Sequence, residues 1–187
     1  MMIRPAESAL PQRRSLRLRG YDYAQAGAYF VTICTQGRAC LFGDVVDGDV
    51  HLNAAWRMVA QCWQDIPNRF PDAALDEFVV MPNHLHGIIV IVGAQFIAPN
   101  DSGAMNSGAM NRAPTVGEMV RSFKAVATRM LRQIQYPSFA WQRNYYEHII
   151  RNEDDLARIR EYIVNNPLQW ALDRENPTNS GQARGEP

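Results

Sequence analysis

Apolar and polar residues alternate along this chain with two periods, about two residues and about 3.6 residues, which predict strands and helices in turn. Residues 29–36 read YFVTICTQ, where β-branched and aromatic residues dominate, and this pattern is typical of a strand. Residues 43–53 are rich in Gly and Asp and predict a hairpin or turn. A helix is expected over residues 54–66, because Asn53 can cap it and its apolar side chains share one face (Trp56, Val59, Ala60 and Trp63). Pro67 is expected to end that helix.

The most apolar part of the chain lies in its middle. Residues 78–81 and 83–92 are rich in Val and Ile, and the second run is continuous enough for a central strand. The turn expected at Pro82 and Asn83 would stand directly before two histidines. Residues 93–114 contain the tandem repeat SGAMN-SGAMN, and their composition predicts a mobile loop.

The second half of the chain predicts two more helices and one more strand. Residues 116–134 form an amphipathic pattern with a basic flank, which comprises Arg121, Lys124, Arg129 and Arg132. Residues 139–151 indicate a turn into a strand. Asn152 can cap a last helix, with Asp155 at the capping-box position, and Pro167 should stop that helix.

This order of elements predicts an α+β fold with a mostly antiparallel sheet and helices packed on it. Residues 1–20 are polar and Arg-rich and are expected to form a basic, mobile arm. The folded domain is expected over residues 21–172, followed by a disordered polar tail over residues 173–187.

Composition and charge narrow the function classes. Hydrophobic residues make up 47% and charged residues 20%, as in ordinary globular proteins, and the longest apolar run, residues 87–93, is far shorter than the about 20 residues that cross a membrane. The three cysteines form no C-x-x-C pair, which favours buried thiols and a cytoplasmic location. The net charge of +0 argues against a nucleic-acid partner. However, residues 1–20 carry five arginines against one acid, and residues 101–151 carry seven basic groups against three acidic. The two alternatives are therefore a basic face and charges scattered over the surface.

His84 and His86 are the strongest candidates for chemistry. On a strand, residues two apart project from the same face, so both imidazoles point one way. Two converging imidazoles make half of a divalent-metal site. The alternative is a pair of polar histidines on an exposed face, but each would need a partner at the start of the most hydrophobic strand.

Residues 79–91, VVMPNHLHGIIVI, resemble the HUH motif of single-tyrosine transposases, which is histidine, hydrophobic residue, histidine. Together with YFVTICTQGR at residues 29–38 and the block at residues 141–167 that ends in REYIVNNP, the chain resembles the REP-associated tyrosine transposases over residues 29–170. The resemblance implies a ferredoxin-like, RRM-like sheet with the HUH motif on a central strand.

The resemblance also implies a set of site residues. Tyr162 would be the nucleophile and Asn166, one helical turn later, the third metal ligand beside the two histidines, with Asn165 as the alternative ligand. The competing interpretation of Tyr162 is a half-buried aromatic on an amphipathic helix. Tyr145 and Tyr146 are taken as core or DNA-stacking residues.

The implied activity is a transposase or endonuclease that uses Mg²⁺ or Mn²⁺ to cleave and rejoin single-stranded, hairpin-forming DNA through a 5′-phosphotyrosine, acting as a monomer or homodimer. The residues predicted to contact DNA are basic: Arg13, Arg14, Arg17, Arg19, Arg121 and Lys124. Two other functions stay open, an inactive domesticated protein that binds hairpin DNA and a hydrolase of small phosphoesters. The second is disfavoured because the sequence has no obvious two-metal carboxylate cluster and no Gly-rich phosphate cradle.

Overall fold

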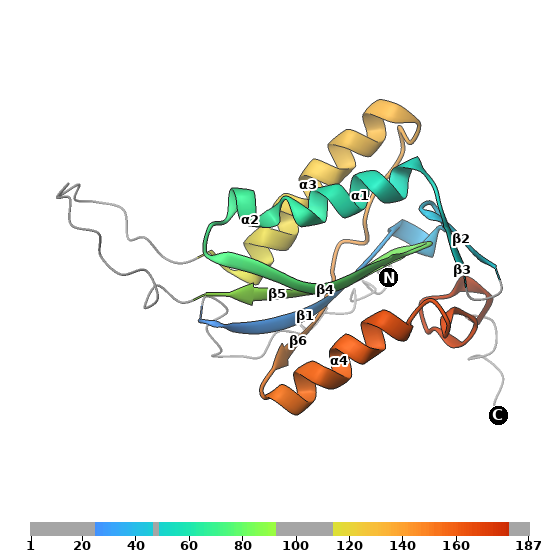
Figure 1. The fold of residues 1–187 in the computed structure, drawn as a ribbon. Coiled ribbons are helices and arrows are strands. Elements are labelled where there is room, and N and C mark those ends of the chain that lie inside the picture. Colours follow the sequence, from blue (N-terminus) through green and yellow to red (C-terminus); the bar gives the residue numbers. More distant parts are fainter. Residues whose placement is uncertain (1–24, 47–48, 93–113, 180–187) are drawn as a thin grey trace, which may run out of the picture.

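The computed structural model describes residues 25–46, 49–92 and 114–179 of the chain (Figure 1). The predicted N-terminal arm and the tandem repeat lie outside the described residues, as do residues 180–187. None of the described helices is both long and apolar enough to cross a membrane.

A four-stranded antiparallel sheet with the strand order β4-β5-β1-β6 forms the centre of the fold. Its strands in chain order are β1 (Gly27–Cys34), β4 (Ala73–Met81), β5 (His84–Ile91) and β6 (Tyr146–Ile150). The predicted strands are therefore confirmed, and the turn at Pro82 and Asn83 joins β4 to β5. The two histidines lie on β5, one of the two central strands, as predicted.

Helices cover both faces of this sheet (Figure 1). Helices α1 (Ala54–Gln64) and α3 (Val116–Ile134) pack on one face, and α4 (Glu153–Asn165) packs on the other. With α1 between β1 and β4 and α3 between β5 and β6, this is the ferredoxin-like α+β arrangement that was expected. The predicted hairpin is present as β2 (Gly43–Val46) and β3 (Asp49–Leu52).

Alternation along β5 divides its side chains between two hydrophobic clusters. Leu85 and Ile89 belong to the main core under α1 and α3, and Ile88 belongs to a smaller cluster under α4. Gly87 lies on the main-core face, where an added Cβ would come within 2.4 Å of the Trp63 ring. That close approach leaves no room for a side chain at Gly87. His84 and His86 are four and two residues before Ile88 on the strand, so they point to the same face and face α4.

Capping side chains fix the ends of the helices. The Asn53 side chain accepts a hydrogen bond from the backbone N–H of Trp56 at 3.0 Å, and Asn152 caps α4 in the same way, as predicted. The prediction that Pro67 ends the first helix is wrong, because α1 already ends at Gln64. Pro67 lies instead in the first turn of the short helix α2 (Ile66–Arg69), where a missing N–H costs nothing.

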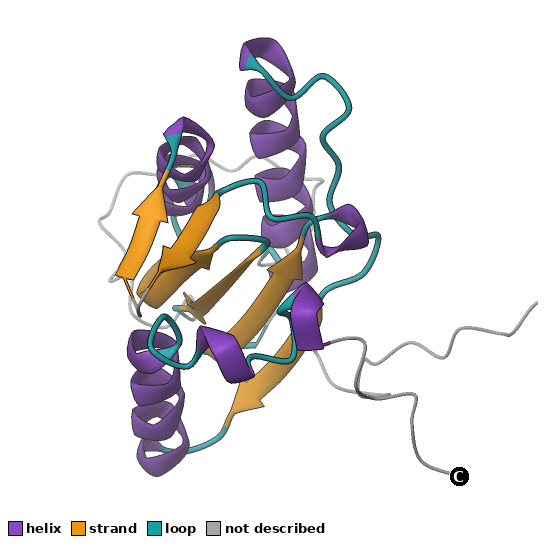
Figure 2. Cartoon of the chain, turned by 90° about the vertical axis from the view of Figure 1, so that its right-hand side faces the viewer, coloured by secondary structure: helices purple, strands orange, loops and turns teal. Residues whose placement is uncertain are grey.

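The ordered structure continues past the predicted domain end. Residues 173–179 fold back beside the strand ends after the short turn η3 (Trp170–Leu172), and Asp173 and Asn176 are buried (Figure 2). The Asn176 side chain donates to the carbonyl of Trp170 at 2.9 Å. The expectation of disorder from residue 173 was therefore too early, because polar side chains that satisfy backbone groups can order a segment with few apolar residues.

Candidate active site

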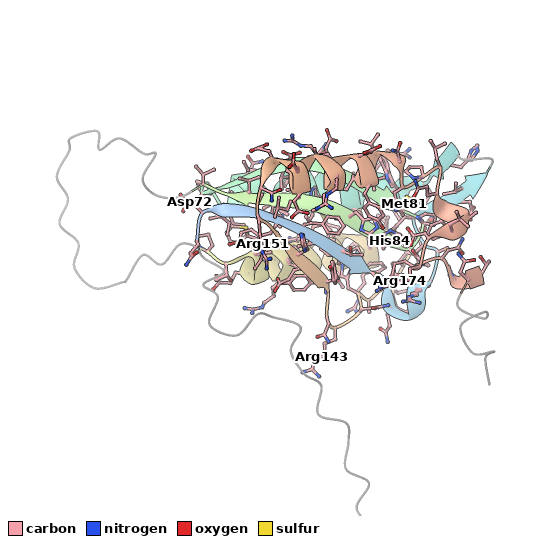
Figure 3. All side chains as sticks on the ribbon, turned by 90° about the horizontal axis from the view of Figure 1, so that it is seen from below. Asp72, Met81, His84, Arg143, Arg151 and Arg174 are labelled. Atoms are coloured by element: carbon pink, nitrogen blue, oxygen red, sulfur yellow. The ribbon has the colours of Figure 1, made fainter. Side chains whose placement is uncertain are left out.

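His84 and His86 lie side by side on the sheet face that α4 covers. Figure 3 views the molecule from this side and labels His84. Their side chains are buried, and the two Nε2 atoms are 2.9 Å apart. A buried polar ring needs a partner at each nitrogen, so the contacts of the two Nδ1 atoms decide what the Nε2 atoms can do.

The Nδ1 atom of His84 is held by Asn83. The Asn83 amide nitrogen donates to two backbone carbonyls, those of Arg38 at 3.1 Å and Glu175 at 2.7 Å. These two bonds fix the amide orientation, so its oxygen faces His84 Nδ1 at 2.8 Å and can only accept. Nδ1 therefore carries the proton, and Nε2 of His84 presents a lone pair.

The Nδ1 atom of His86 lies 2.8 Å from the hydroxyl oxygen of Thr32, which is its direct cross-strand partner on β1. This contact directs Nε2 of His86 toward Nε2 of His84. Two lone pairs at 2.9 Å repel one another unless a proton or a cation lies between them. A distance of about 3 Å is also the separation of adjacent ligands around an octahedral ion with bonds of about 2.1 Å.

Asp173 and Asn166 complete this cluster. The carboxylate oxygen of Asp173 lies 3.9 Å from His84 Nε2, and one ligand atom from each of His84, His86 and Asp173 falls within 4.8 Å of the others. The Asn166 amide donates to Asp173 at 2.9 Å, while its carbonyl oxygen is buried without a hydrogen-bond partner among the described residues. A buried, unpaired amide oxygen beside two imidazoles and a carboxylate fits a divalent cation. Asn165, the alternative ligand, is only half-buried.

Sequence reasoning missed Asp173 because this residue lies in the segment expected to be disordered. The one available signal was Trp170, an aromatic residue in an otherwise polar stretch, which calls for a place to be buried. In the structure the Trp170 ring packs 6.0 Å from the His84 ring, and the turn that follows it brings Asp173 to the histidines.

Both imidazoles are held in their neutral form. Burial lowers the pKa of His84 to about 3, with a smaller contribution from the charge of Arg38. Burial, followed by the neighbouring His84, also lowers the pKa of His86 well below its usual value, and Asp173 opposes this effect. Only neutral imidazole binds a metal ion, so the site is ready for a cation at neutral pH.

The lowered pKa of His84 predicts a loss of stability in acid. Between about pH 3 and pH 6.5 the unfolded chain binds a proton at His84 that the folded chain does not, so the free energy of unfolding falls as the pH falls through this window. In the presence of a chelator, the free energy of unfolding of wild type should fall by up to about 1.4 kcal/mol more per pH unit of acidification than that of His84→Gln. Urea unfolding between pH 4 and pH 7 measures this slope, and His51→Gln, at an exposed position on β3, is the control. Parallel curves for wild type and His84→Gln would contradict it.

Tyr162 extends from α4 to the same cluster. Its hydroxyl oxygen lies 3.2 Å from His86 Nε2, and its ring contacts the rings of His86 and Phe30 edge-on at 5.2 Å and 6.0 Å. The side chain is 41% exposed, so a substrate can reach it. Burial, then the charges of Asp173 and Glu175, raise the pKa of Tyr162 to about 12, against a lowering by the hydrogen bond with Asn166.

The two tyrosines considered as alternatives lie elsewhere. Tyr145 packs against the main core, and its hydroxyl donates to Glu147 at 2.9 Å. Tyr146 is 48% exposed, and its ring lies 6.3 Å from the Phe30 ring. Tyr162, in contrast, places its hydroxyl 3.2 Å from Nε2 of His86 in the cluster.

Two of the residues predicted to bind DNA lie in the described part of the chain, and the sheet separates these two from the histidines. The four arm arginines, Arg13, Arg14, Arg17 and Arg19, lie outside the described residues. Arg121 and Lys124 are on α3, across the sheet from α4 (Figure 1). Lys124 donates to the carbonyls of Gln142 at 2.9 Å and Asn144 at 3.1 Å, and burial lowers its pKa to about 8. Contact with DNA stays a prediction for all six residues.

Comparison with known proteins finds relatives in sequence and in fold. An uncharacterized protein of Haemophilus influenzae is 44% identical over 170 residues, which cover 89% of this chain and 94% of that protein. A second Haemophilus influenzae protein, provisionally named a REP-associated tyrosine transposase, is 24% identical over 154 residues and covers 79% of this chain and 74% of its own length. No protein-family model matches the chain.

The solved structure of a REP-associated tyrosine transposase bound to a REP hairpin has the same fold. It aligns with a TM-score of 0.56 at 20% identity, over 86% of this chain and 77% of that protein. The chain therefore belongs to one family with the uncharacterized Haemophilus influenzae protein, and it resembles the REP-associated tyrosine transposases in sequence motifs and in fold.

Proposed function

We propose that this protein is a metal-dependent DNA strand-transferase that cleaves and rejoins single-stranded, hairpin-forming DNA through a covalent bond to Tyr162. One observation carries the proposal. The hydroxyl of Tyr162 lies 3.2 Å from His86 Nε2, beside a buried cluster that consists of two neutral imidazoles and the carboxyl group of Asp173. A nucleophile next to such a cluster is the arrangement that phosphodiester chemistry needs.

The comparisons support the choice of substrate. The structural neighbour is described as bound to a REP hairpin, and the relative at 24% identity is named for the same activity. On the proposed function, the partner of this chain is therefore a DNA hairpin with an unpaired strand that can enter the site.

The residues that would hold the metal ion are His84, His86 and Asn166, with Asp173 as a fourth ligand. Two imidazoles with an amide and a carboxylate oxygen suit Mn²⁺ or Mg²⁺. When bound, the ion would polarise the scissile phosphodiester and offset the negative charge that develops on its oxygens. Asn83 and Thr32 would orient the imidazoles from outside, as the partners of metal-bound histidines commonly do.

Tyr162 would carry the covalent step. Its phenolic oxygen attacks phosphorus in line with the bond to the 3′ oxygen, a new oxygen–phosphorus bond forms, and the old bond to the 3′ oxygen breaks. The leaving 3′ oxygen takes up a proton to balance the one that Tyr162 loses, which gives a 5′-phosphotyrosine and a free 3′-OH. A 3′-OH that attacks the phosphotyrosine reverses these changes and rejoins strands, so no external energy source is needed.

A second candidate is a hairpin-binding protein without catalysis. The raised pKa of Tyr162, about 12, favours it, because the neutral phenol is a poor nucleophile. Asp173 and Glu175 contribute to that shift, so their charges would have to be compensated before Tyr162 can react.

One experiment separates the two functions. Wild-type protein is incubated with labelled single-stranded hairpin DNA and Mn²⁺, with a chelator in a parallel reaction, and the products are resolved on a denaturing protein gel. A labelled band at the mass of protein plus DNA, dependent on Mn²⁺, supports strand transfer. Tight hairpin binding without such a band, across hairpins of varied loop and flank, would leave only the binding function.

The position of Tyr162 depends on an ion pair between α4 and the sheet. Arg160, two residues before Tyr162, donates from Nε to Asp76 on β4 at 2.8 Å and makes a second bond to the other carboxylate oxygen. Asp76 lies where the β4–β5 register shifts between Leu75 and Phe78, and such an irregularity re-aims a side chain. Apolar contacts of α4 with the sheet come from the buried Ile163 and the partly buried Leu156 and Ile159, and the ion pair adds a directional contact beside them.

Arg160→Lys keeps the charge but loses the forked contact, so we expect it to slow adduct formation about tenfold or more, since displacements near 1 Å cost about 100-fold. Hairpin and Mn²⁺ affinity should stay unchanged, and the exchange of both partners, Asp76→Arg with Arg160→Asp, should restore part of the rate. Single-turnover kinetics measures the effect, with Arg158→Lys on the same helix as the control. A fall in hairpin affinity that matches the fall in rate would instead make Arg160 a DNA contact.

A further inference from the structure

Tyr146 occupies an unusual place for a large aromatic residue. It is the first residue of β6, the edge strand of the sheet, and it is 48% exposed. It lies directly opposite Thr32 on β1, and Thr32 lies directly opposite His86 on β5. Directly opposed residues of antiparallel strands share a face, so Tyr146, Thr32 and His86 form one row on the α4 face of the sheet.

The rings around Phe30 tie Tyr146 to the site. Phe30 contacts the Tyr146 ring edge-on at 6.3 Å and the Tyr162 ring edge-on at 6.0 Å. Phe30 itself is buried, so it supports both tyrosines from below. Tyr146 stands two strand spacings from His86, about 10 Å, which is within reach of nucleotides next to a phosphate held at Tyr162.

Two exposed arginines, Arg143 and Arg174, are labelled in Figure 3, which views the molecule from the side of α4. Arg143 precedes β6, is exposed, and forms no ion pair with another described residue. Arg174 is 87% exposed and close enough to Tyr162 to lower its pKa in part. An exposed aromatic ring, with Arg143 three residues before it in the chain and Arg174 near Tyr162, matches a single DNA strand, whose bases stack and whose phosphates are negative.

We propose that Tyr146 is a stacking platform for a base of the unpaired strand that leads to Tyr162, with Arg143 at the adjoining phosphate. The proposal rests on the proposed function, since it names the part of the DNA that this site holds. A core role for Tyr146 is excluded by its exposure. Stacking on tyrosine accepts any base, so the subsite would hold the strand without reading its sequence.

The test uses binding in the Tyr162→Phe background, where no cleavage can occur. The probes are a hairpin with a single-stranded flank that carries 2-aminopurine and the same hairpin with blunt ends. Tyr146→Ala should weaken binding of the flanked hairpin about tenfold or more and should remove the fluorescence quenching, and it should leave the blunt hairpin unaffected. Tyr146→Phe should behave like the parent protein because the ring is kept.

Ile134→Ala is the matched control, since Ile134 is 44% exposed and lies on α3, across the sheet. Equal affinity of Tyr146→Ala and its parent for the flanked hairpin would overturn the proposal. A change in sedimentation with unchanged DNA affinity would also overturn it and would make the β6 edge a contact between two copies of the chain. If the flanked hairpin shows the stacking effect but wild type forms no adduct, the platform stands and the strand-transfer activity fails.

Discussion

Tyr162→Phe is expected to abolish covalent attachment of DNA, with adduct formation at least about 1,000-fold below wild type, while hairpin and Mn²⁺ binding stay within about twofold. The substitution removes one oxygen atom and nothing else from the site. The Tyr162 hydroxyl lies 3.2 Å from Nε2 of His86, whereas the Tyr145 hydroxyl donates to Glu147. Loss of the atom that forms the bond removes the covalent route entirely, whereas loss of an orienting group only slows it. Single-turnover gels with labelled hairpin DNA measure the first quantity, and fluorescence anisotropy measures the second.

Tyr145→Phe and Tyr146→Phe are the matched controls, because each removes one hydroxyl from a tyrosine near the same edge of the sheet. Both should retain the adduct at near the wild-type rate. The ring of Tyr162 contacts Phe30 and His86 edge-on, and these contacts persist in phenylalanine, so the variant should also keep the stability of wild type. An adduct in Tyr162→Phe that disappears in Tyr145→Phe or Tyr146→Phe would move the nucleophile to that residue.

Much of the fold follows from local patterns. The alternation over β1, the continuous apolar run of β5, the caps at Asn53 and Asn152 and the proline after α4 each involve residues close in sequence. The structure confirms each of these predictions. Side chains alternate along a strand, so the spacing of two residues predicts that both histidines of β5 share a face. This prediction needs no knowledge of the rest of the chain. The prediction that Pro67 ends the first helix was wrong, because a proline is acceptable in the first turn of a helix as well as after its end.

The parts that could not be predicted depend on contacts between distant residues. Asn83 holds His84 only because the carbonyls of Arg38 and Glu175 fix its amide, and these residues are far apart in the sequence. Asp173 reaches the site through a turn that is stabilised by hydrogen bonds between polar residues, a pattern that resembles disorder in composition. The face that Tyr146 occupies depends on strand pairing with β1, so the sequence left core and stacking roles equally open.

The electrostatics of the cluster explain why a cation matters for its residues. Without a proton between them, the Nε2 lone pairs of His84 and His86 would repel one another at 2.9 Å. Burial, followed by the charges of Asp173 and Glu175, raises the pKa of Tyr162. A positive charge at this point would relieve the first repulsion and oppose the second effect. Asp173, one of the proposed ligands, is thus also one of the groups that raise the pKa of Tyr162, after burial.

His84→Ala and His86→Ala each remove one imidazole and are expected to weaken Mn²⁺ binding by at least about 100-fold. In known metal sites, loss of a residue that only hydrogen-bonds to a ligand already weakens metal binding by about 10- to 100-fold. Asp173→Asn keeps the shape of the side chain but loses its charge, so we expect a weakening of about 10- to 100-fold. Isothermal titration with Mn²⁺ measures these affinities directly. The rise in unfolding temperature on addition of Mn²⁺ gives an independent readout, since a ligand at 100 times its Kd adds about 2.7 kcal/mol to stability.

His148→Ala is the control for the histidine variants, because His148 binds Asp155 at 2.9 Å on the same sheet face and is not among the clustered ligands. It should bind Mn²⁺ like wild type. Two variants of Asn166 test its role as a ligand apart from that of Asp173. Asn166→Asp should keep or strengthen Mn²⁺ binding, because a carboxylate oxygen replaces the unpaired amide oxygen. Asn166→Leu should weaken Mn²⁺ binding, because it offers no oxygen. If His84→Ala and Asp173→Asn both bind Mn²⁺ as tightly as wild type, the ion lies elsewhere, and the paired histidines must then share a proton to tolerate their separation.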